Sequence, residues 1–334
     1  MELSVSATTG KREHSISSRH HQHAVLSRIA LVVLKYHGCM NQAKATVCVL
    51  AAGVLWGCIS LFVRQLDAYG LSSMDIASVR MFVAALFMFV VVLVKDRSLF
   101  RIRLRDLWMF AGTGIVSVML FNVCYFTCIT MSEASIAVVL LYTSPLFVML
   151  MSALFFKEKV TKRKIVALVL TFSGCALVAG LLGGSFVLPP LALVTGIASG
   201  FFYATYSIFG RVALERYDTL TVTFYTFVMG SLAGLVLGDP VKIAALAIDS
   251  PSTIAWYLGL GILCTLLPYL LYTAGLKYLE TTKAAIFATV EPLVGSVLGI
   301  FAYGESVGVQ KILGIVFILA AVVLANSEKS ETRD

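Results

Sequence analysis

Ten long apolar segments between Lys44 and the C-terminal tail limit this chain to very few folds. Each segment is close to the ~20 residues that an α-helix needs to cross the hydrocarbon core of a bilayer. Strand pairs are excluded, because the runs are too long and an open sheet would leave unpaired backbone groups in lipid. The sequence therefore predicts an all-α integral membrane protein with ten transmembrane helices. The expected spans are residues 45–64, 73–94, 106–127, 134–156, 163–182, 188–210, 219–238, 254–276, 283–303 and 308–326.

Composition supports the same fold class and narrows the range of functions. The 334 residues are 59% hydrophobic and 13% charged, whereas soluble domains carry about 25% charged residues. The net charge of +8 is then a signal of membrane orientation, and we expect no nucleic-acid partner. The phosphate-binding pattern G-x-x-x-x-G-K-[ST] is absent, so we expect no nucleotide cofactor, and transport would have to draw on a gradient.

The sequence also contains an internal repeat with an offset of 147 residues. Both copies place a tyrosine, two glutamates, an alanine, a proline and a lysine in the same order and at the same spacing. A fixed offset over this length predicts two five-helix repeats, residues 44–182 and 188–327. The matching pairs are Tyr125 and Tyr272, Glu133 and Glu280, Ala137 and Ala284, Pro145 and Pro292, Glu158 and Glu305, and Lys164 and Lys311.

Lysine and arginine residues are distributed unevenly between the two sides of the expected bundle. If the N-terminus is cytosolic, sixteen lie in the cytosolic loops and C-terminal tail and three, Arg64, Lys242 and Lys311, lie on the other side. Positive charge is retained in the cytosol, so both termini are predicted there, and the protein in the plasma or inner membrane. Because five is an odd number, the second repeat is inverted relative to the first. Inverted repeats are typical of secondary transporters, whose substrate site lies near the midplane.

The two ends of the chain differ from its apolar body. Residues 1–43 are polar and contain all five histidines, and residues 328–334 form a short polar cytosolic tail. We predict that residues 1–43 are a disordered cytosolic tail, because nothing apolar there could build a site. A metal site at the histidines is one alternative, and translated sequence upstream of the true start is another. No other metal site is expected.

Several motifs make the chain resemble the EamA-type transporters of the drug/metabolite transporter (DMT) superfamily. The first repeat shows GVLWG at Gly53–Gly57 and SEASIAVVLLYTSPLF from Ser132; the second shows GIASG at Gly196–Gly200 and ETTKAAIFATVEPLVG from Glu280. Order, spacing and duplication carry the resemblance, which covers about residues 47–326. It implies multi-pass transport of small organic solutes such as amino acids, metabolites or drugs, often with proton coupling.

Glu291 is the strongest candidate for a functional side chain. It lies about eight residues, or ~12 Å, into the span 283–303, and it is the only carboxylate expected well inside the hydrocarbon. A charge there costs several kcal/mol, so such a side chain faces the bundle interior by default. It could carry a proton or bind a cationic substrate. The alternative is a structural carboxyl that is protonated or hydrogen-bonded to a neighbouring helix.

Pro145 and Pro292 lie in the middle of equivalent spans. Proline has no N–H, so the carbonyls of Leu141 and Ala288 lose their usual partners. Free carbonyls can line a cavity or let a helix bend, and their duplication favours a gating role over a static kink. Two duplicated glutamates at the ends of the same spans are expected to be structural, for example as acceptors for loop amides: Glu158 and Glu305.

A group of polar and aromatic residues would suit a pocket for a flat or amphipathic solute. Tyrosines at mid-depth are not explained by an interfacial belt, although packing with hydroxyls bonded across helices is the alternative for any one of them. Arg80 could bind a carboxylate or pair with Glu291, but a structural role near the interface is favoured. The candidates for substrate binding or coupling are Trp56, Arg80, Asn122, Tyr125, Tyr142, Tyr203, Tyr206, Tyr269, Tyr272 and Glu291.

The expected function is secondary transport of small organic solutes by alternating access, with export as the favoured direction and proton coupling through Glu291. Uptake, uncoupled facilitated diffusion and a non-transporting receptor with the same fold are the alternatives. An enzyme is disfavoured, because the spans contain no histidine and no paired carboxylates that could form an active site. The expected partners are the lipid bilayer, an organic solute and protons.

Overall fold

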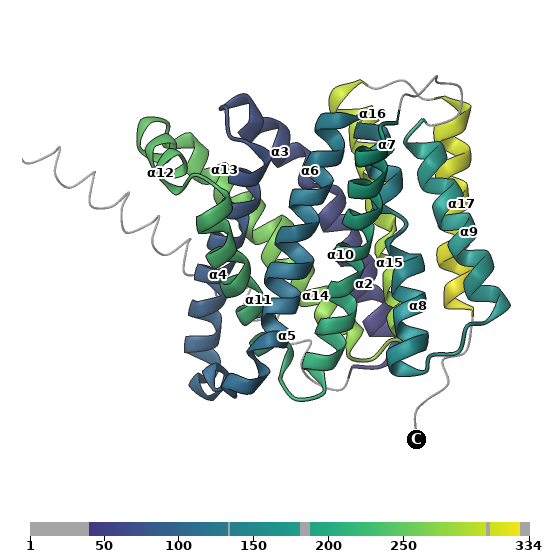
Figure 1. The fold of residues 1–334 in the computed structure, drawn as a ribbon, viewed down its shortest axis with the longest axis horizontal. Coiled ribbons are helices and arrows are strands. Elements are labelled where there is room, and N and C mark those ends of the chain that lie inside the picture. The colour runs from purple at the N-terminus through teal and green to yellow at the C-terminus, as the bar shows by residue number, and fades with distance from the viewer. Residues whose placement is uncertain (1–39, 133, 181–187, 305–307, 328–334) are drawn as a thin grey trace, which may run out of the picture. The chain divides into compact units, whose positions relative to one another are not determined.

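The computed structural model describes residues 40–132, 134–180, 188–304 and 308–327, and the fold given below is that of the unit that begins at Gln42. Most of the expected N-terminal tail, the expected C-terminal tail from residue 328, and both Glu133 and Glu305 lie outside the described residues. Within the described ranges the chain forms helices and turns and no strand, so the predicted all-helical class is confirmed there (Figure 1).

The helices follow one another along the chain with short connections. In the first half they are α2 (Gln42–Gly57), α3 (Ile59–Ala68), α4 (Ser73–Lys95), η1 (Arg97–Phe100), η2 (Leu104–Asp106), α5 (Leu107–Ala111), η3 (Gly112–Leu120), α6 (Phe121–Met131), α7 (Ala134–Leu141), α8 (Ser144–Phe156) and α9 (Lys162–Val178). In the second half they are α10 (Pro190–Leu214), α11 (Thr219–Leu237), α12 (Pro240–Asp249), α13 (Ser252–Gly261), η4 (Ile262–Leu266), α14 (Leu267–Leu276), α15 (Thr281–Ala288), α16 (Val290–Tyr303) and α17 (Val309–Asn326).

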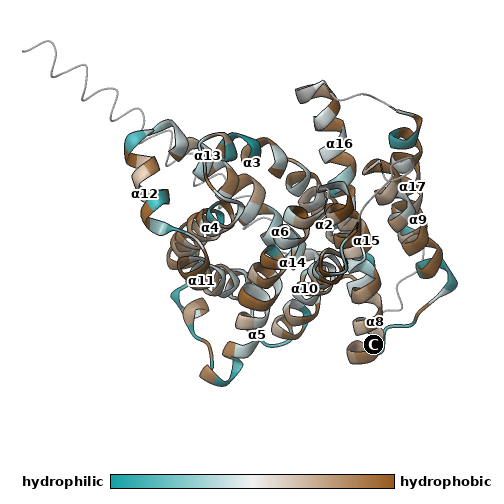
Figure 2. Ribbon diagram, turned by 45° about the horizontal axis from the view of Figure 1, so that its top comes forward, coloured by the Kyte–Doolittle hydropathy of each residue, from teal (hydrophilic) through white to brown (hydrophobic). Residues whose placement is uncertain are grey.

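Nine helical stretches in the described part of the chain are long and apolar enough to cross a membrane. They match nine of the expected spans, while the tenth, expected at 163–182, is overlapped by the 17-residue helix α9 and is not among the nine. Figure 2 shows that the helices are mostly hydrophobic along their length, while hydrophilic residues gather at helix ends and turns. Large apolar side chains such as Val94, Leu154 and Phe301 are exposed on the outside. Such a surface is suited to contact with lipid.

Helix α4 begins at a capping box that its sequence encodes. The Asp75 N–H donates to Ser72 Oγ at 3.2 Å, and the Ser72 N–H donates to Asp75 Oδ2 at 2.9 Å. Each bond satisfies a backbone group that a helix start leaves without an intrahelical partner. Asp75 also accepts from the Asp239 N–H at 2.8 Å. One carboxylate therefore starts α4 and ties it to the turn between α11 and α12.

Helix contacts repeat with the same offset as the sequence. Helix α2 packs against α14, and α10 packs against α6. A Cβ built on Gly114 would lie 2.4 Å from the Thr226 carbonyl oxygen, and one built on Gly261 would lie 2.4 Å from a Val83 methyl group. Because both glycines lack a Cβ, the helices can approach each other closely at these crossings. Two π-helical segments, η3 and η4, also overlap when the first is shifted by the repeat offset.

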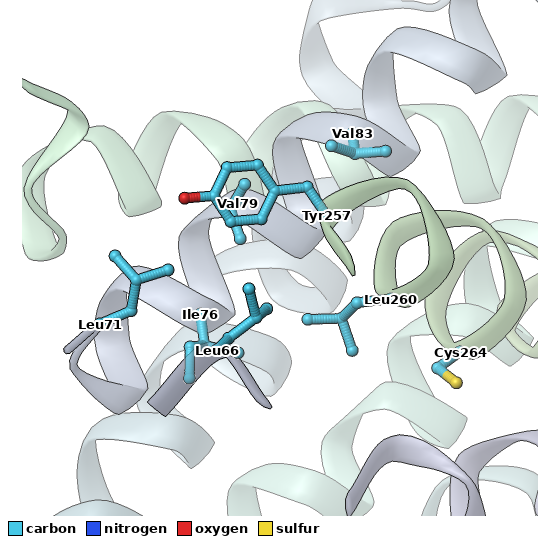
Figure 3. Close-up of a cluster of buried hydrophobic side chains, with 8 residues drawn as sticks. All are labelled: Leu66, Leu71, Ile76, Val79, Val83, Tyr257, Leu260 and Cys264. Atoms are coloured by element: carbon cyan, nitrogen blue, oxygen red, sulfur yellow. The ribbon is translucent and has the colours of Figure 1, made fainter. Parts of the chain in front are cut away.

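An apolar cluster holds α3 against α4 and α13 (Figure 3). Its members come from the end of α3 and the following turn, from one face of α4, and from α13 and η4. They are Leu66, Leu71, Ile76, Val79, Val83, Tyr257, Leu260 and Cys264. The cluster fixes the position of α3, which carries part of the rim of the cavity described next.

Candidate functional site

A cavity of about 520 Å³ lies among the helices and extends from one end of the bundle to its middle. Its rim includes Arg64 within α3, Ser73 at the start of α4 and Lys311 in the first turn of α17. Its inner part includes Arg80 and Glu291. Arg80 lies seven residues beyond Ser73, which corresponds to a rise of about 10 Å along α4.

We call the end of the bundle with this rim the mouth end. We call the opposite end the basic end, because two loops there are rich in lysine and arginine. These loops follow α4 and α8, and they comprise residues 96–106 and 157–161.

Seven of the predicted binding, coupling or gating residues line the cavity. They come from α2, α4, α6, α16 and the break between α7 and α8, so distant parts of the sequence converge there. They are Trp56, Arg80, Asn122, Tyr125, Tyr142, Glu291 and Pro292. Three small residues of α16, Gly295, Ser296 and Gly299, also line it. Their spacing of three and four residues places them on one helical face with Glu291, which is the sequence signal that could have identified them.

The other four predicted tyrosines form a floor beneath the cavity. Together with Trp56 they line a separate void of about 30 Å³, which is enough for about one water molecule. The Tyr269 ring packs edge-on against Trp56 and Tyr206, with centroid distances of 5.3 and 5.0 Å. The Tyr206 hydroxyl is 2.6 Å from Thr273 Oγ1, and the Tyr272 hydroxyl is 2.7 Å from Ser207 Oγ. From the sequence, hydrogen bonds between helices were the alternative to a substrate-binding role for each tyrosine. Tyr206 and Tyr272 form such bonds in the structure.

Glu291 lies in the first turn of α16, next to the break that separates α15 from α16. The Tyr203 hydroxyl donates to Glu291 Oε2 over a distance of 3.5 Å. The N-terminal turn of a helix carries a partial positive charge that favours a carboxylate there. Glu291 is therefore a carboxyl at mid-span that faces the cavity and has one long hydrogen bond.

Arg80 faces the same cavity from α4. Its guanidinium lies beside the Tyr269 hydroxyl, but its Nε is buried and has no hydrogen-bond partner among the described residues. The contact with Tyr269 joins α4 to α14, so the structural role favoured from the sequence stays a prediction. The unsatisfied Nε is a buried donor among the described residues, which costs free energy.

Both spans that contain a predicted gating proline are broken beside it. Helix α7 gives way to α8 just before Pro145, and α15 gives way to α16 two residues before Pro292. A single continuous helix was expected in each span. The break occurs because proline lacks an N–H and its ring clashes with the carbonyl four residues earlier. Among the described residues, Pro292 lines the cavity and Pro145 does not.

A glycine of the opposite repeat approaches each carbonyl that faces a proline. A Cβ built on Gly53 would lie 2.9 Å from the Ala288 oxygen, and one built on Gly200 would lie 3.1 Å from the Leu141 oxygen. Gly53 and Gly200 are 147 residues apart, as are Leu141 and Ala288. The two helix breaks are therefore held in matched crossings, α15 against α2 and α7 against α10.

At the basic end, α8 and α15 are joined by Glu158, which follows α8. Its Oε1 accepts from the Thr281 N–H at 2.7 Å, and its Oε2 accepts from the Thr282 N–H at 3.3 Å and the Thr282 hydroxyl at 3.0 Å. Lys164 Nζ lies 2.8 Å from Glu280 Oε2 in the same region. These groups tie the end of the broken span in the first repeat to the start of the broken span in the second.

A second set of contacts at the basic end, centred on the Asp106 carboxylate, joins a loop of the first repeat to a loop of the second. Asp106 accepts from Arg216 Nη1 and from the Tyr217 hydroxyl, each at 2.6 Å. Burial raises the pKa of the Tyr217 phenol, and the bond to Asp106 raises that pKa further. Tyr217 therefore stays protonated and continues to donate at neutral pH.

Comparison with known proteins assigns the fold and site to a family. The EamA-like transporter family matches the sequence twice, over residues 43–180 and 190–327. The chain belongs to the EamA-like transporter family. An EamA repeat therefore occurs in each half of this multi-pass membrane protein, which is consistent with membership of the DMT superfamily.

Relatives of this EamA protein are transporters by name. An uncharacterized transporter of Archaeoglobus fulgidus is 30% identical over 86% of this chain and 97% of its own length. The uncharacterized inner membrane transporter YicL of Salmonella typhimurium is 26% identical over 85% of this chain and 95% of its own length. A protein crystal structure superposes with a TM-score of 0.71 at 17% identity, covering 85% of this chain and 96% of that chain. This superposition supports the fold alone.

Proposed function

We propose that this EamA-family protein is a secondary transporter of the cell membrane that moves small organic solutes by alternating access. The proposed topology has ten spans in two inverted five-helix repeats, with α9 as the fifth span and both termini in the cytosol. The excess of lysine and arginine at the basic end supports this orientation. The mouth end then faces the outside, and the structure represents an outward-open state.

The observation that carries the proposal is the central cavity, whose lining among the described residues comes from the mouth end and from mid-span and includes no residue of the two basic loops. It extends from the mouth end to mid-span and ends on the floor formed by Tyr203, Tyr206, Tyr269 and Tyr272. On the far side of this floor, α8 packs against α15 through Val148 and Ala285, near the hydrogen bonds of Glu158. A central site closed on one side is what one state of an alternating-access transporter requires.

The two broken spans are the elements we expect to move. Each break separates a half-span at the mouth end from a half-span at the basic end. A helix with a proline break can bend at a small cost, because the interrupted hydrogen bonds need not be broken again. Closure at the mouth end would bring α7 and α16 together, and release at the basic end would separate α8 from α15.

Proton coupling is assigned to Glu291, and we propose export in exchange for protons. Glu291 is placed to exchange a proton with the cavity, because it faces the cavity at mid-span and receives a single long hydrogen bond from Tyr203. Intramembrane carboxyls in such positions act as proton relays in transporters. A proton taken up from the outside would be released when the site faces the cytosol.

The test uses purified protein in liposomes that contain a pH-sensitive dye, with a panel of amino acids, aromatic metabolites and cationic drugs. The variant Glu291→Gln keeps the shape of the side chain but cannot exchange a proton, and Glu215→Gln is the control because Glu215 is exposed in a loop. We expect a solute to drive proton flux in the native protein and in the control, and not in Glu291→Gln. Equal solute flux without a proton signal would indicate a facilitator, and no flux for any solute would indicate a non-transporting protein.

A further inference from the structure

Helix α12 (Pro240–Asp249) is a short helix at the mouth end that is not among the nine apolar spans of the described chain. Its ten residues rise only about 15 Å, half of the ~30 Å that a span must cross. Figure 1 shows α12 at the edge of the bundle, beside α13. Lys242 Nζ donates to the Gly70 carbonyl at 2.6 Å, and the Tyr257 hydroxyl donates to the Ile243 carbonyl at 3.4 Å. These bonds fix α12 on the bundle.

Three different faces run along α12. Ile243, Leu246 and Ala247 pack against the apolar cluster shown in Figure 3. Lys242 and Asp249 are both exposed and seven residues apart, so they form a polar line along one side of the helix. The third face lies away from the cluster and is an exposed apolar stripe with a spacing of three and four residues, made up of Val241, Ala244, Ala245 and Ile248.

The exposed stripe of α12 continues the lipid-facing surface of α11. Val241 is 76% exposed and Ile248 is 78% exposed, and Val236 in the last turn of the membrane span α11 is 82% exposed. Only Gly238 and Asp239 separate the two helices. Large apolar side chains that are exposed along a span are suited to contact with lipid. The bilayer that covers the end of α11 is therefore the nearest apolar partner for the stripe.

Aromatic residues mark this level of the bundle as the boundary between membrane and water. Trp256 packs against the same cluster as α12, and its ring lies edge-on to Phe62 with a centroid distance of 5.9 Å. Tyr69 is exposed, and its hydroxyl is 3.2 Å from Ser252 Oγ at the start of α13. Tryptophan and tyrosine are enriched where a membrane meets water. Their position beside α12 and the start of α13 indicates the depth of α12.

We propose that α12 is an interfacial helix that docks on the lipid leaflet at the mouth end through its exposed apolar stripe. Helices that present separate apolar and polar faces lie in the plane of the interface, with the apolar face at the boundary between headgroups and acyl chains. The polar line lies between the stripe and the packed face, so Lys242 and Asp249 stay in water while the stripe contacts lipid. This inference goes beyond the transport proposal and does not depend on it.

Docking of α12 has a consequence for the cavity. Helix α12 packs on the cluster that positions α3 against α4, and these two helices carry Arg64 and Ser73 of the rim. A lipid contact at α12 therefore holds this side of the rim at a constant depth in the membrane.

The first experiment identifies what the stripe contacts. The photoreactive residue p-benzoylphenylalanine replaces Val241, Ala245 or Ile248, one at a time, in the full-length protein in liposomes of phosphatidylethanolamine and phosphatidylglycerol. Val236 in α11 is the lipid-facing reference, and Asp249 on the polar line of α12 is the matched control. After illumination, mass spectrometry should detect lipid adducts at the three stripe positions at about the level of Val236, and about tenfold fewer at Asp249.

The second experiment measures what the lipid contact contributes to α12. Val241→Asn and Ile248→Asn are combined in one variant, because asparagine has a helix propensity close to that of valine and isoleucine. Neither side chain belongs to the packed face, so the cluster is left intact. In nanodiscs of the same lipids, hydrogen exchange in residues 240–249 should become about tenfold faster. Asp249→Asn, which alters the polar line only, should leave it unchanged.

Three results would overturn the inference. Crosslinks from the stripe to a second copy of the protein would assign it to a protein interface. Lipid adducts at the stripe that are as few as at Asp249 would place the stripe in water. Equal exchange of residues 240–249 in the native protein and the double variant would show that lipid does not stabilise α12.

Discussion

The mouth end and the basic end of the bundle use equivalent half-helices in opposite ways. At the mouth end, α7 and α16 line the same cavity. At the basic end, their continuations α8 and α15 pack together and are joined by the bonds of Glu158 to Thr281 and Thr282. Both ends are built from the same repeated sequence pattern. Under the proposed alternating-access function, the difference reflects the contacts of one state, and the shared pattern is compatible with closure at either end.

The largest expected effect is loss of closure at the basic end when Glu158 is replaced. Glu158→Ala removes three hydrogen bonds from the start of α15 and leaves two N–H groups without acceptors. Because bonds to a charged group contribute about 1.5–3 kcal/mol each, hydrogen exchange in residues 281–288 should become about a hundredfold faster. Hydrogen–deuterium exchange with mass spectrometry provides the measurement.

Two comparisons make the Glu158 result specific to the closed end. Peptides at the start of α4, at the mouth end, should not exchange faster in Glu158→Ala than in the native protein. Glu215→Ala, which removes an exposed loop carboxylate, should leave residues 281–288 unchanged. Equal exchange of that segment in all three proteins would show that Glu158 does not hold α15.

The next effect concerns the glycine contacts that hold the broken spans. A Cβ at position 200 would lie 2.4 Å from Thr143 Oγ1 and 2.9 Å from the Leu140 oxygen, so Gly200→Ala must push α10 away from the break between α7 and α8. Overpacking of this kind costs about 1–3 kcal/mol. We expect a lower thermal unfolding temperature in detergent and a lower transport rate.

Gly295→Ala is the matched control for that variant, since both glycines lie within spans. Among the described residues, a Cβ on Gly295 would meet only the Gly57 oxygen, at 3.8 Å, which is ordinary contact. Alanine is also the better helix former by about 1 kcal/mol, so this variant should be as stable as the native protein or slightly more stable. If Gly200→Ala is equally stable, the crossing at the break is looser than the distances indicate.

Sequence patterns were sufficient to predict the apolar spans, because lipid imposes a length and a composition on every span. They were also sufficient to recognise the repeat and the family. They also singled out Glu291, since a carboxylate in such a segment stands out; Glu291 lines the cavity, and its role in coupling stays a prediction. The contact of Glu158 with Thr281 was not predictable, because its partners include backbone N–H groups, which almost every residue has. The unsatisfied Nε of Arg80 could not be predicted either, because its state depends on which of the described groups surround it across several helices.

A smaller effect is expected at the mouth end, where Asp75 ties α4 to the turn before α12. Asp75→Asn keeps one acceptor oxygen but weakens the capping box and the contact with Lys242, whose Nζ lies 3.7 Å from Asp75 Oδ2. The loss should be about 1 kcal/mol, in the range for a helix cap, and Asp67→Asn should have no effect because Asp67 is exposed. Thermal unfolding of both variants tests this, and a loss as large as that of Gly200→Ala would contradict it.

The smallest effect is expected at Asp96 in the basic end, and it should depend on pH. Asp96 caps η1 by accepting from the Ser98 hydroxyl and N–H at 2.7 and 2.8 Å, and these bonds lower the pKa of its carboxyl below the ordinary value of 3.8. Because the folded state favours the ionised form, Asp96 contributes stability above pH 3.8 that is lost as the pH falls through the lower pKa of the folded state. Asp96→Asn should therefore unfold at a slightly lower temperature than the native protein at pH 7, and the gap should close towards pH 3. A gap of constant size would contradict this prediction, because it would show that the contribution of Asp96 does not depend on the charge of its carboxylate.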